Sequence, residues 1–278
     1  MVGRGGRRGR PPARLPVQLP ALAGALLAVT ACSQQAPAAP AGTPAPVARP
    51  ATGAEAPPPP VVVLDPGHNG GNATAPGVIG APVPAGGFTK PCNTTGTSTD
   101  AGYPEHAYAF DVSLRAAELL RARGVVVVLT RTDDTGVGPC VDRRAQIANE
   151  ARAALAVSVH ADGAAASARG YHVVEPALAP DGGNAAVLAA SDVAARDLLA
   201  AFGAATGSPR AGYPGDLVEP GLTRRDDLAG LNLARTPAVL LESANMRNPE
   251  EAAAVSDPAW RQRAAQGVAD GVLAFLAR

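Results

Sequence analysis

The sequence predicts a single α/β domain over about residues 61–278, with a mostly parallel β-sheet covered by helices on both faces. Short apolar runs of strand length recur along this region, many of them rich in β-branched residues, at residues 61–64, 125–129, 155–159, 171–174 and 238–241. Helical patterns lie between these runs, and such an alternation is typical of parallel sheets with helices on both faces. The length of the region suits one domain of this kind.

The amino-terminal residues 1–32 are predicted to be a signal peptide. Five arginines precede residue 15, no acidic residue occurs before Glu55, and an apolar run follows at 19–31. This run is too short to cross a bilayer, as is typical of a secretory signal. It ends in Val-Thr-Ala-Cys, which resembles a bacterial lipobox, so Cys32 would become the lipidated first residue of an exported protein. Ordinary cleavage nearby, with Cys32 incidental, is the alternative.

Residues 33–60 are predicted to form a tether rather than a folded unit. They consist mainly of Ala, Pro, Gly, Ser and Gln and end in four prolines. Such a composition cannot bury enough apolar surface to fold, and its prolines favour an extended chain. At about 3.1 Å per residue, the segment would hold the domain tens of ångströms from its anchor.

The first predicted strand, 61–64, belongs to the stretch VVVLDPGHNGG at 61–71. Asp-Pro-Gly stops the strand and places His68 at its carboxyl end. In open α/β sheets, ligands and catalytic groups collect at this end, and histidine is the commonest metal ligand. A lone histidine at a strand end is more often structural, so the interpretation depends on finding partners for His68.

Four helices are predicted between and after the strands. The first spans 105–123, where Gly124 ends it, and its apolar residues share one face: Phe110, Leu114, Ala117 and Leu120. Further helices are predicted at 142–152 and 185–205. The last begins with Asp257 as its N-cap and a proline in its first turn, and it runs to the carboxyl terminus.

The stretch 69–102 interrupts this pattern. It is rich in Gly, Pro, Thr and Asn and shows no convincing periodicity, so we expect a functional lid or a disordered insert. Cys92 lies within it, and Cys140 lies in the connection after the second strand. In an exported protein, two thiols left after lipidation of Cys32 are expected to oxidise, which would stabilise the fold by roughly 2–4 kcal/mol. Two unpaired thiols are the alternative.

Three other residues are candidates to act with His68. His160 ends the strand at 155–159, Glu105 lies in the first turn of a helix, and Glu242 ends the last strand. Two histidines and a glutamate are a common catalytic zinc set, with one position left for water. A further carboxylate can take a proton from that water and pass it to a leaving amine, which is the role expected for Glu242.

Three polar residues near these candidates have less specific interpretations. His106 neighbours Glu105 but points elsewhere on its helix, and His172 lies within a strand, so neither is favoured as a ligand. Asp65 either orients a metal ligand without binding the metal itself or forms the turn before Pro-Gly.

Four motifs occur in order along the domain: DPGH at 65–68, Pro-Glu at 104–105, SVHAD at 158–162 and PAVLLESANMRNPEEA at 237–252. Together they resemble the zinc-dependent N-acetylmuramoyl-L-alanine amidases of the amidase 3 type, over essentially all of 61–278. The resemblance implies a mixed sheet flanked by helices and one zinc ion bound by His68, Glu105 and His160. It also implies that Glu242 is the catalytic glutamate.

The resemblance extends to details around these motifs. Asn245 and Asn248 match polar residues that follow the catalytic glutamate, and 224–232 resembles a segment near the family's substrate groove. Asn69 stands where the family usually has glycine, and Ser243 stands where glycine is common. The 69–102 loop with its cysteine resembles the disulfide-bearing variants of actinobacterial members.

The resemblance implies cleavage of the amide between the lactyl group of N-acetylmuramic acid and L-Ala of the stem peptide. Peptidoglycan and muropeptides would be the partners of a monomeric enzyme in the cell envelope. The formal net charge of +0 gives no argument for nucleic-acid binding. Two alternatives stay open: a zinc peptidase acting on the stem peptide, and a non-catalytic wall-binding lipoprotein.

Overall fold

The computed structural model describes residues 57–278. The predicted signal peptide, Cys32 and nearly all of the predicted tether therefore lie outside the described residues. Residues 57–60 are exposed and lead directly into β1 (Val61–Pro66). Within this described part of the chain, every helix is too short or too polar to cross a membrane.

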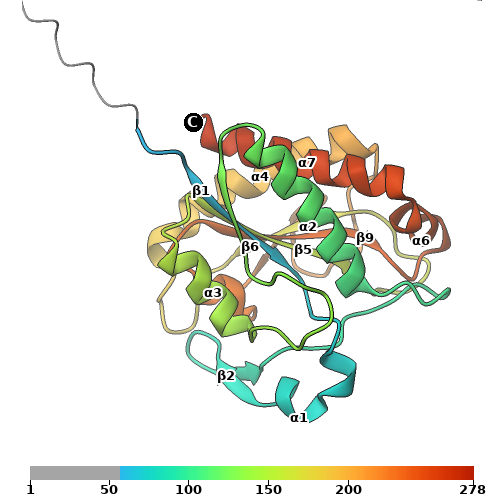
Figure 1. The fold of residues 1–278 in the computed structure, drawn as a ribbon, viewed down its shortest axis with the longest axis horizontal. Helices are drawn as coiled ribbons and strands as arrows, with labels where there is room; N and C mark the ends of the chain where they lie inside the picture. The colour runs from blue at the N-terminus through green and yellow to red at the C-terminus, as the bar shows by residue number, and fades with distance from the viewer. Residues whose placement is uncertain (1–56) are drawn as a thin grey trace, which may run out of the picture. The chain divides into compact units, whose positions relative to one another are not determined.

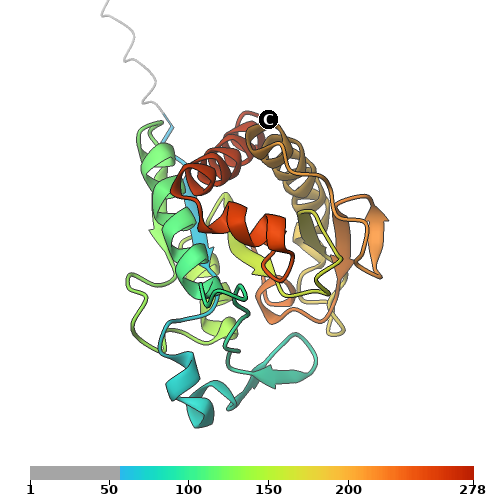
Figure 2. The same ribbon diagram turned by 90° about the vertical axis from the view of Figure 1, so that its right-hand side faces the viewer.

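The core of the domain is a seven-stranded sheet with the order β4-β1-β5-β9-β6-β8-β7 (Figures 1 and 2). Its other strands are β4 (Val126–Leu129), β5 (Leu155–Asp162), β6 (His172–Pro176), β7 (Leu217–Glu219), β8 (Leu222–Arg225) and β9 (Ala238–Asn245). The strands β4, β1, β5 and β9 run parallel to one another and β6 is parallel to β8, whereas β6 is antiparallel to β9 and β7 is antiparallel to β8. The expected mixed, mostly parallel sheet is confirmed.

Helices cover both faces of this sheet. The helices α2 (Glu105–Arg121), α4 (Leu188–Thr206) and α7 (Pro258–Leu276) cover one face, and α4 and α7 lie side by side (Figure 1). The opposite face is covered by α3 (Val141–Glu150) and the short α5 (Ala229–Asn232). Alternate residues of β1 face these two helix layers. Val62 and Leu64 belong to the large core with α2 and α7, whereas Val63 packs with Ala148 of α3.

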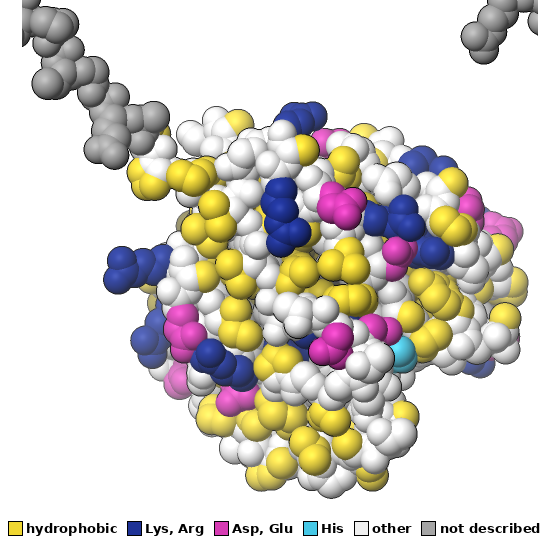
Figure 3. Space-filling view, viewed as in Figure 1, with side chains coloured by type: hydrophobic (Ala, Val, Ile, Leu, Met, Phe, Trp, Pro, Cys, Tyr) yellow, Lys and Arg dark blue, Asp and Glu magenta, His cyan; other side chains and the backbone are white. Residues whose placement is uncertain are grey.

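The segment 69–102 has more regular structure than the sequence predicted. It contains a 3₁₀ turn (Asn72–Thr74), the single-turn helix α1 (Pro76–Ile79) and a hairpin of β2 (Pro82–Pro84) with β3 (Thr89–Pro91). Elements of three or four residues are too short to produce a periodic pattern, so they could not be predicted from the sequence. On the face in Figure 3, hydrophobic side chains gather over the lower part, where α1 and β2 lie.

Some connecting elements were also absent from the sequence-based prediction, among them β7, β8, α5 and α6 (Pro249–Ser256). The helix α6 joins β9 to α7, and Asn248 caps it by accepting hydrogen bonds from the backbone N–H groups of Glu250 and Glu251. For the site, the important result is the order β1-β5-β9 at the centre of the sheet. Because these strands are parallel, the side chains that follow or end them meet at one edge.

Candidate metal centre

Three of the candidate residues converge at this edge. His68 follows β1, His160 lies on the neighbouring β5, and Glu105 is the first residue of α2. His68 Nε2 lies 3.1 Å from Glu105 Oε1, and His160 Nδ1 lies 2.8 Å from the same oxygen. One donor atom from each residue falls within 4.8 Å of the other two, so the group could hold a metal ion.

The backbone of His68 takes an unusual conformation. Its φ of 56° lies in the left-handed region, which residues other than glycine rarely adopt. The imidazole is fixed from the opposite side, because Nδ1–H donates to the Thr94 carbonyl at 3.1 Å. This hydrogen bond keeps a proton on Nδ1 and directs Nε2 at Glu105, so Nε2 is the ring nitrogen available to a metal.

Glu105 is also held by donors other than the histidines. It is buried, its Oε2 accepts the backbone N–H of Thr97 at 2.9 Å, and its Oε1 accepts that of Ala161 at 3.3 Å. Burial alone would raise the pKa of this carboxyl, but the hydrogen bonds and charges of His160 and His68 outweigh burial and lower it. Glu105 is therefore ionised, as a carboxylate ligand must be.

Two glycines let the ligands approach one another. A Cβ atom on Gly67 would lie 2.3 Å from the His160 ring, and one on Gly96 would lie 2.8 Å from Glu105 Oε2. Both distances are shorter than ordinary Cβ contacts, so a side chain at either position would displace one of the candidate ligands.

Glu242 lies beside this group. It is on β9, where it is the register partner of His160 on β5. Its Oε2 is buried and has no hydrogen-bond partner within residues 57–278. Burial raises the pKa of this carboxyl well above its usual value, and the nearby acids Glu105 and Asp162 raise it further. A carboxyl whose pKa is raised in this way takes up a proton more readily than an exposed one.

The four residues line one cavity of about 460 Å³ on the α3–α5 face of the sheet. Its floor away from the metal centre is mainly apolar and includes Val174, Leu231 and Leu240. The segment 224–232 contributes Arg225 and residues 228–231 to the lining. Its expected place beside a groove therefore agrees with the structure.

The two histidines that were not favoured as ligands, His106 and His172, lie outside the group of possible metal ligands. His106 directs Nδ1 at the Asp134 carboxylate, 2.9 Å away. His172 is the first residue of β6 rather than lying mid-strand, and it packs edge-on against Tyr213. It is buried and is the register partner of Glu242.

Asn245 and Asn248 face a loop rather than the cavity. Asn245 Nδ2 donates to the carbonyls of Ala165 and Ala168, and Asn248 Nδ2 donates to that of Ala166. They therefore fasten the loop that follows His160.

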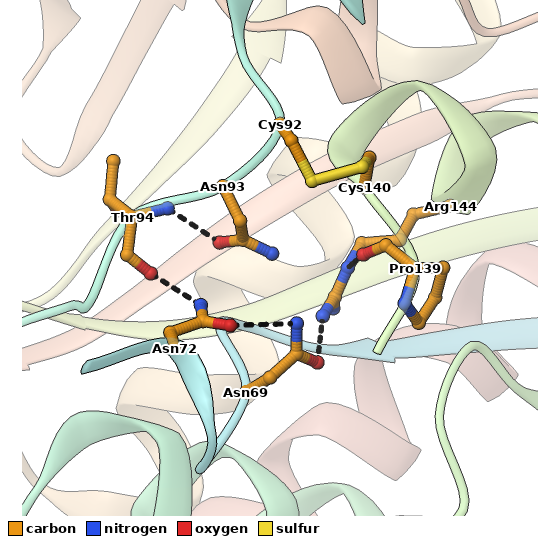
Figure 4. The surroundings of a disulfide bond; sticks show 8 residues. All are labelled: Asn69, Asn72, Cys92, Asn93, Thr94, Pro139, Cys140 and Arg144. Carbon is orange, nitrogen blue, oxygen red and sulfur yellow. Dashed lines mark hydrogen bonds between the residues drawn. A yellow bond between two sulfur atoms is a disulfide. The ribbon is translucent and has the colours of Figure 1, made fainter. Parts of the chain in front are cut away.

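The expected disulfide is present. Cys92 at the end of β3 is bonded to Cys140, the N-cap of α3 (Figure 4). The hairpin is also fastened near its tip, because Asn232 Nδ2 donates to the Ala85 carbonyl at 2.8 Å. Lys90 Nζ donates to the Asp227 carbonyl at 2.6 Å. The β2–β3 hairpin is thus attached both to α3 and to the segment around α5.

In the described part of the chain, no hydrogen bond joins the Asp65 carboxylate to the imidazole of His68. That carboxylate accepts hydrogen bonds from Arg144, Thr130 and Ser158 at 2.5–2.7 Å. Burial opposes ionisation, yet Arg144 and the two hydroxyls together lower the pKa of Asp65 to about 2. Arg144 and the similarly buried Arg131 could not be singled out from the sequence, because charged residues in a polar stretch are expected to be exposed to solvent.

Comparisons with a family model, with a curated protein and with solved structures all point to the same family. A family model described as N-acetylmuramoyl-L-alanine amidase (Amidase_3) matches residues 62–274. The chain is 44% identical over 221 residues to N-acetylmuramoyl-L-alanine amidase Rv3717 of Mycobacterium tuberculosis, covering 78% of this chain and 86% of that protein. It is also similar to the crystal structure of the N-acetylmuramyl-L-alanine amidase Ami1 of Mycobacterium smegmatis, with a TM-score of 0.72, 41% identity and coverage of 78% and 97%. The apo form of Ami1 from Mycobacterium abscessus gives a TM-score of 0.70 and 41% identity, with coverage of 78% and 98%.

Proposed function

Because this chain belongs to the Amidase_3 family of N-acetylmuramoyl-L-alanine amidases, we propose that it is a zinc enzyme whose metal ligands are His68, Glu105 and His160. The reaction is hydrolysis of the amide between N-acetylmuramic acid and L-Ala of the peptidoglycan stem peptide. The observation that carries the proposal is the position of three donor atoms within 4.8 Å of one another, beside a glutamate with an unpaired carboxylate oxygen.

The donor set fits zinc. Two imidazole nitrogens and one carboxylate are a common catalytic set for this ion, and they leave one position open. The hydrogen bond from His68 Nδ1 to the Thr94 carbonyl supports this fit, because it orients the ring and leaves Nε2 as the nitrogen that would bind the metal. When bound, zinc would lower the pKa of a coordinated water toward about 7 and polarise the scissile carbonyl.

Glu242 is proposed as the proton carrier. Its Oε2 has no other partner in the described part of the chain, so it is free to accept a proton from the attacking water. The same carboxyl would then deliver the proton to the departing L-Ala nitrogen. The raised pKa of Glu242, due to burial and to the charges of Glu105 and Asp162, supports this role because it favours proton uptake.

The reaction is tested by mass spectrometry of purified peptidoglycan digested with the protein. An amidase releases intact stem peptides that begin with L-Ala, together with glycan chains bearing free lactyl groups. Shorter peptides with the muramic acid link intact would instead indicate a stem-peptide peptidase. Absence of any soluble product, with protein bound to the wall, would indicate a wall-binding protein without catalysis.

We further propose that the protein acts outside the cytoplasm as a monomeric lipoprotein. Its substrate is cell-wall material, which supports export. The lipid anchor at Cys32 and the division into 1–32, 33–60 and 61–278 rest on the sequence alone, since these amino-terminal residues lie outside the described range. Metabolic labelling with a fatty acid tests the anchor, because Cys32→Ala should abolish incorporation while the wild-type protein is labelled.

A further inference from the structure

The segment that carries His68 needs support from outside the sheet. Residues 66–68 run from the end of β1, and His68 has a φ of 56°. In this region Cβ crowds the neighbouring carbonyl, so a residue other than glycine stays there only when its surroundings hold it. The backbone carbonyls of such a buried segment also need donors.

Two buried arginines supply these donors. Arg131 and Arg144 each have only 5% of their surface exposed. The Pro66 carbonyl accepts from Arg131 Nε at 3.0 Å and from Arg144 Nη1 at 2.6 Å. The Gly67 carbonyl accepts from Arg131 Nη2 at 3.2 Å, and the His68 carbonyl accepts from Arg144 Nη2 at 2.7 Å. Three successive carbonyls are therefore bound by two guanidinium groups.

The other donors of Arg144 also act on this segment. It donates to Asp65 Oδ1 and to Asn69 Oδ1, both at 2.6 Å, so it bonds to residues on either side of the three carbonyls. Figure 4 shows Arg144 directed at Asn69, with the Cys92–Cys140 bond above it. Its remaining bond, from Nε to the Pro139 carbonyl at 3.0 Å, attaches the guanidinium to the chain just before α3.

Arg131 connects the same segment to the helix that carries the second ligand. Its Nη2 donates at 2.7 Å to the carbonyl of His106, the residue after Glu105. Its Nη1 donates to Asp134 Oδ1 at 2.8 Å and to the Asp133 carbonyl at 2.9 Å. Each arginine is thus paired with a carboxylate, so neither adds an uncompensated positive charge behind the metal centre.

We propose that Arg131 and Arg144 are positioning residues that hold residues 66–68 in the conformation presenting His68 to the metal. This proposal rests on the zinc site proposed above. Ordinary buried ion pairs would account for the contacts with Asp65 and Asp134. They do not account for the fact that six of the ten hydrogen bonds from the two guanidinium groups end on residues 65–69.

The test measures zinc affinity of the purified protein by competition with a chelator, independently of hydrolysis. Arg144→Lys keeps the charge but cannot reproduce the planar fork of donors. We expect it to weaken zinc binding about 10- to 100-fold, the usual range for residues that orient metal ligands, and Arg131→Lys to act in the same direction. In Arg144→Ala, millimolar guanidinium should restore zinc affinity at least ~3-fold, because the free ion can refill the vacated site.

A matched control is Arg261→Lys. Arg261 is also largely buried and donates to Asp111 Oδ2 and to the carbonyls of Val255 and Ser256, on the opposite face of the sheet. The Arg261→Lys variant should lose stability, but its zinc affinity should stay within about twofold of wild type. If its zinc affinity falls as much as that of the Arg144 variant, general destabilisation is the cause and the proposal is overturned.

If the arginine variants do not fold, Asn69→Ala removes a single acceptor of Arg144 and carries the test. We expect its zinc affinity to fall at least ~3-fold. Zinc affinities within twofold of wild type in every folded variant overturn the role of the arginines. A wild-type protein that binds no zinc overturns the proposed metal site instead, so the two failures are distinguishable.

Discussion

Removal of the Cys92–Cys140 disulfide is expected to destabilise the domain while leaving the metal centre able to form. The bond joins residues 48 apart in sequence, and the closed loop contains Glu105. Reduction would release the end of β3 from α3, but neighbouring backbone bonds would stay. Cys92 N–H donates to the Ala81 carbonyl at 2.7 Å, and Val141 N–H donates to the Cys92 carbonyl at 2.8 Å.

The size of the effect follows from the loop length. In the chain-entropy model, a loop of this length is worth about 4 kcal/mol, and typical measured values are about 2–4 kcal/mol. For a domain of this size, each kcal/mol corresponds to about 2–4 °C in Tm, so the melting temperature should fall by about 4–16 °C. Zinc stoichiometry should stay at one, because the ligands lie at strand and helix ends. Substrate affinity should change more, because the hairpin borders the cavity.

Differential scanning calorimetry without reductant compares the wild type with the double variant Cys92→Ser/Cys140→Ser, which leaves no free thiol of the pair. Adding reductant should lower the Tm of the wild type to that of the variant and should not change the variant. Equal melting temperatures of the two oxidised samples would refute the reasoning. So would free alkylation of both thiols in exported wild-type protein without reductant.

Three further substitutions test the site and its surroundings. Glu242→Gln keeps the shape but cannot accept a proton, so kcat should fall about 10²-fold or more with zinc retained; near-normal turnover would place the base elsewhere. His68→Ala should lose the bound zinc equivalent measured by elemental analysis, and stoichiometric zinc in this variant would contradict the ligand assignment. Asp65 has a pKa lowered from 3.8 to about 2, so its ionised form stabilises the fold above about pH 4 and this contribution is lost as the pH falls toward 2. The unfolding free-energy advantage of wild type over Asp65→Asn should therefore shrink by about 2 kcal/mol between pH 5 and pH 2 in urea titrations, and an advantage that stays constant would show that the charge of Asp65 is not responsible.

The sequence by itself determined the class of fold and the places of its central strands, although β1, β5 and β9 run two to four residues beyond their predicted ends. Apolar runs of four or five residues predict buried strands because such a run is recognised from its own residues, without knowledge of the rest of the chain. Polar residues directly after such runs must lie at a sheet edge, which is why His68 and His160 could be singled out. Glu105 and Glu242 followed from a helix start and a strand end by the same reasoning.

Other features depended on neighbours distant in sequence. The strand β6 lies between β9 and β8, antiparallel to β9 and parallel to β8, and this brings His172 beside Glu242. Apolar periodicity shows which face of a strand is buried but not which strand lies next to it, so the sequence predicted a strand near 171–174 without its direction. The short elements of 69–102 are likewise held by bonds to distant residues, such as Cys140 and Asn232.

The burial of Arg131 and Arg144 is the feature that most clearly depends on the tertiary structure. In the sequence, Arg131 lies in TRTDD and Arg144 in VDRRAQ, where a charged residue is expected to face solvent. A guanidinium is buried only when its donors are satisfied, and here the acceptors are backbone carbonyls and carboxylates brought together from β1, α2 and the connection before α3. The left-handed backbone of His68 has the same origin, because its own residue type disfavours that conformation and contacts from elsewhere in the fold impose it.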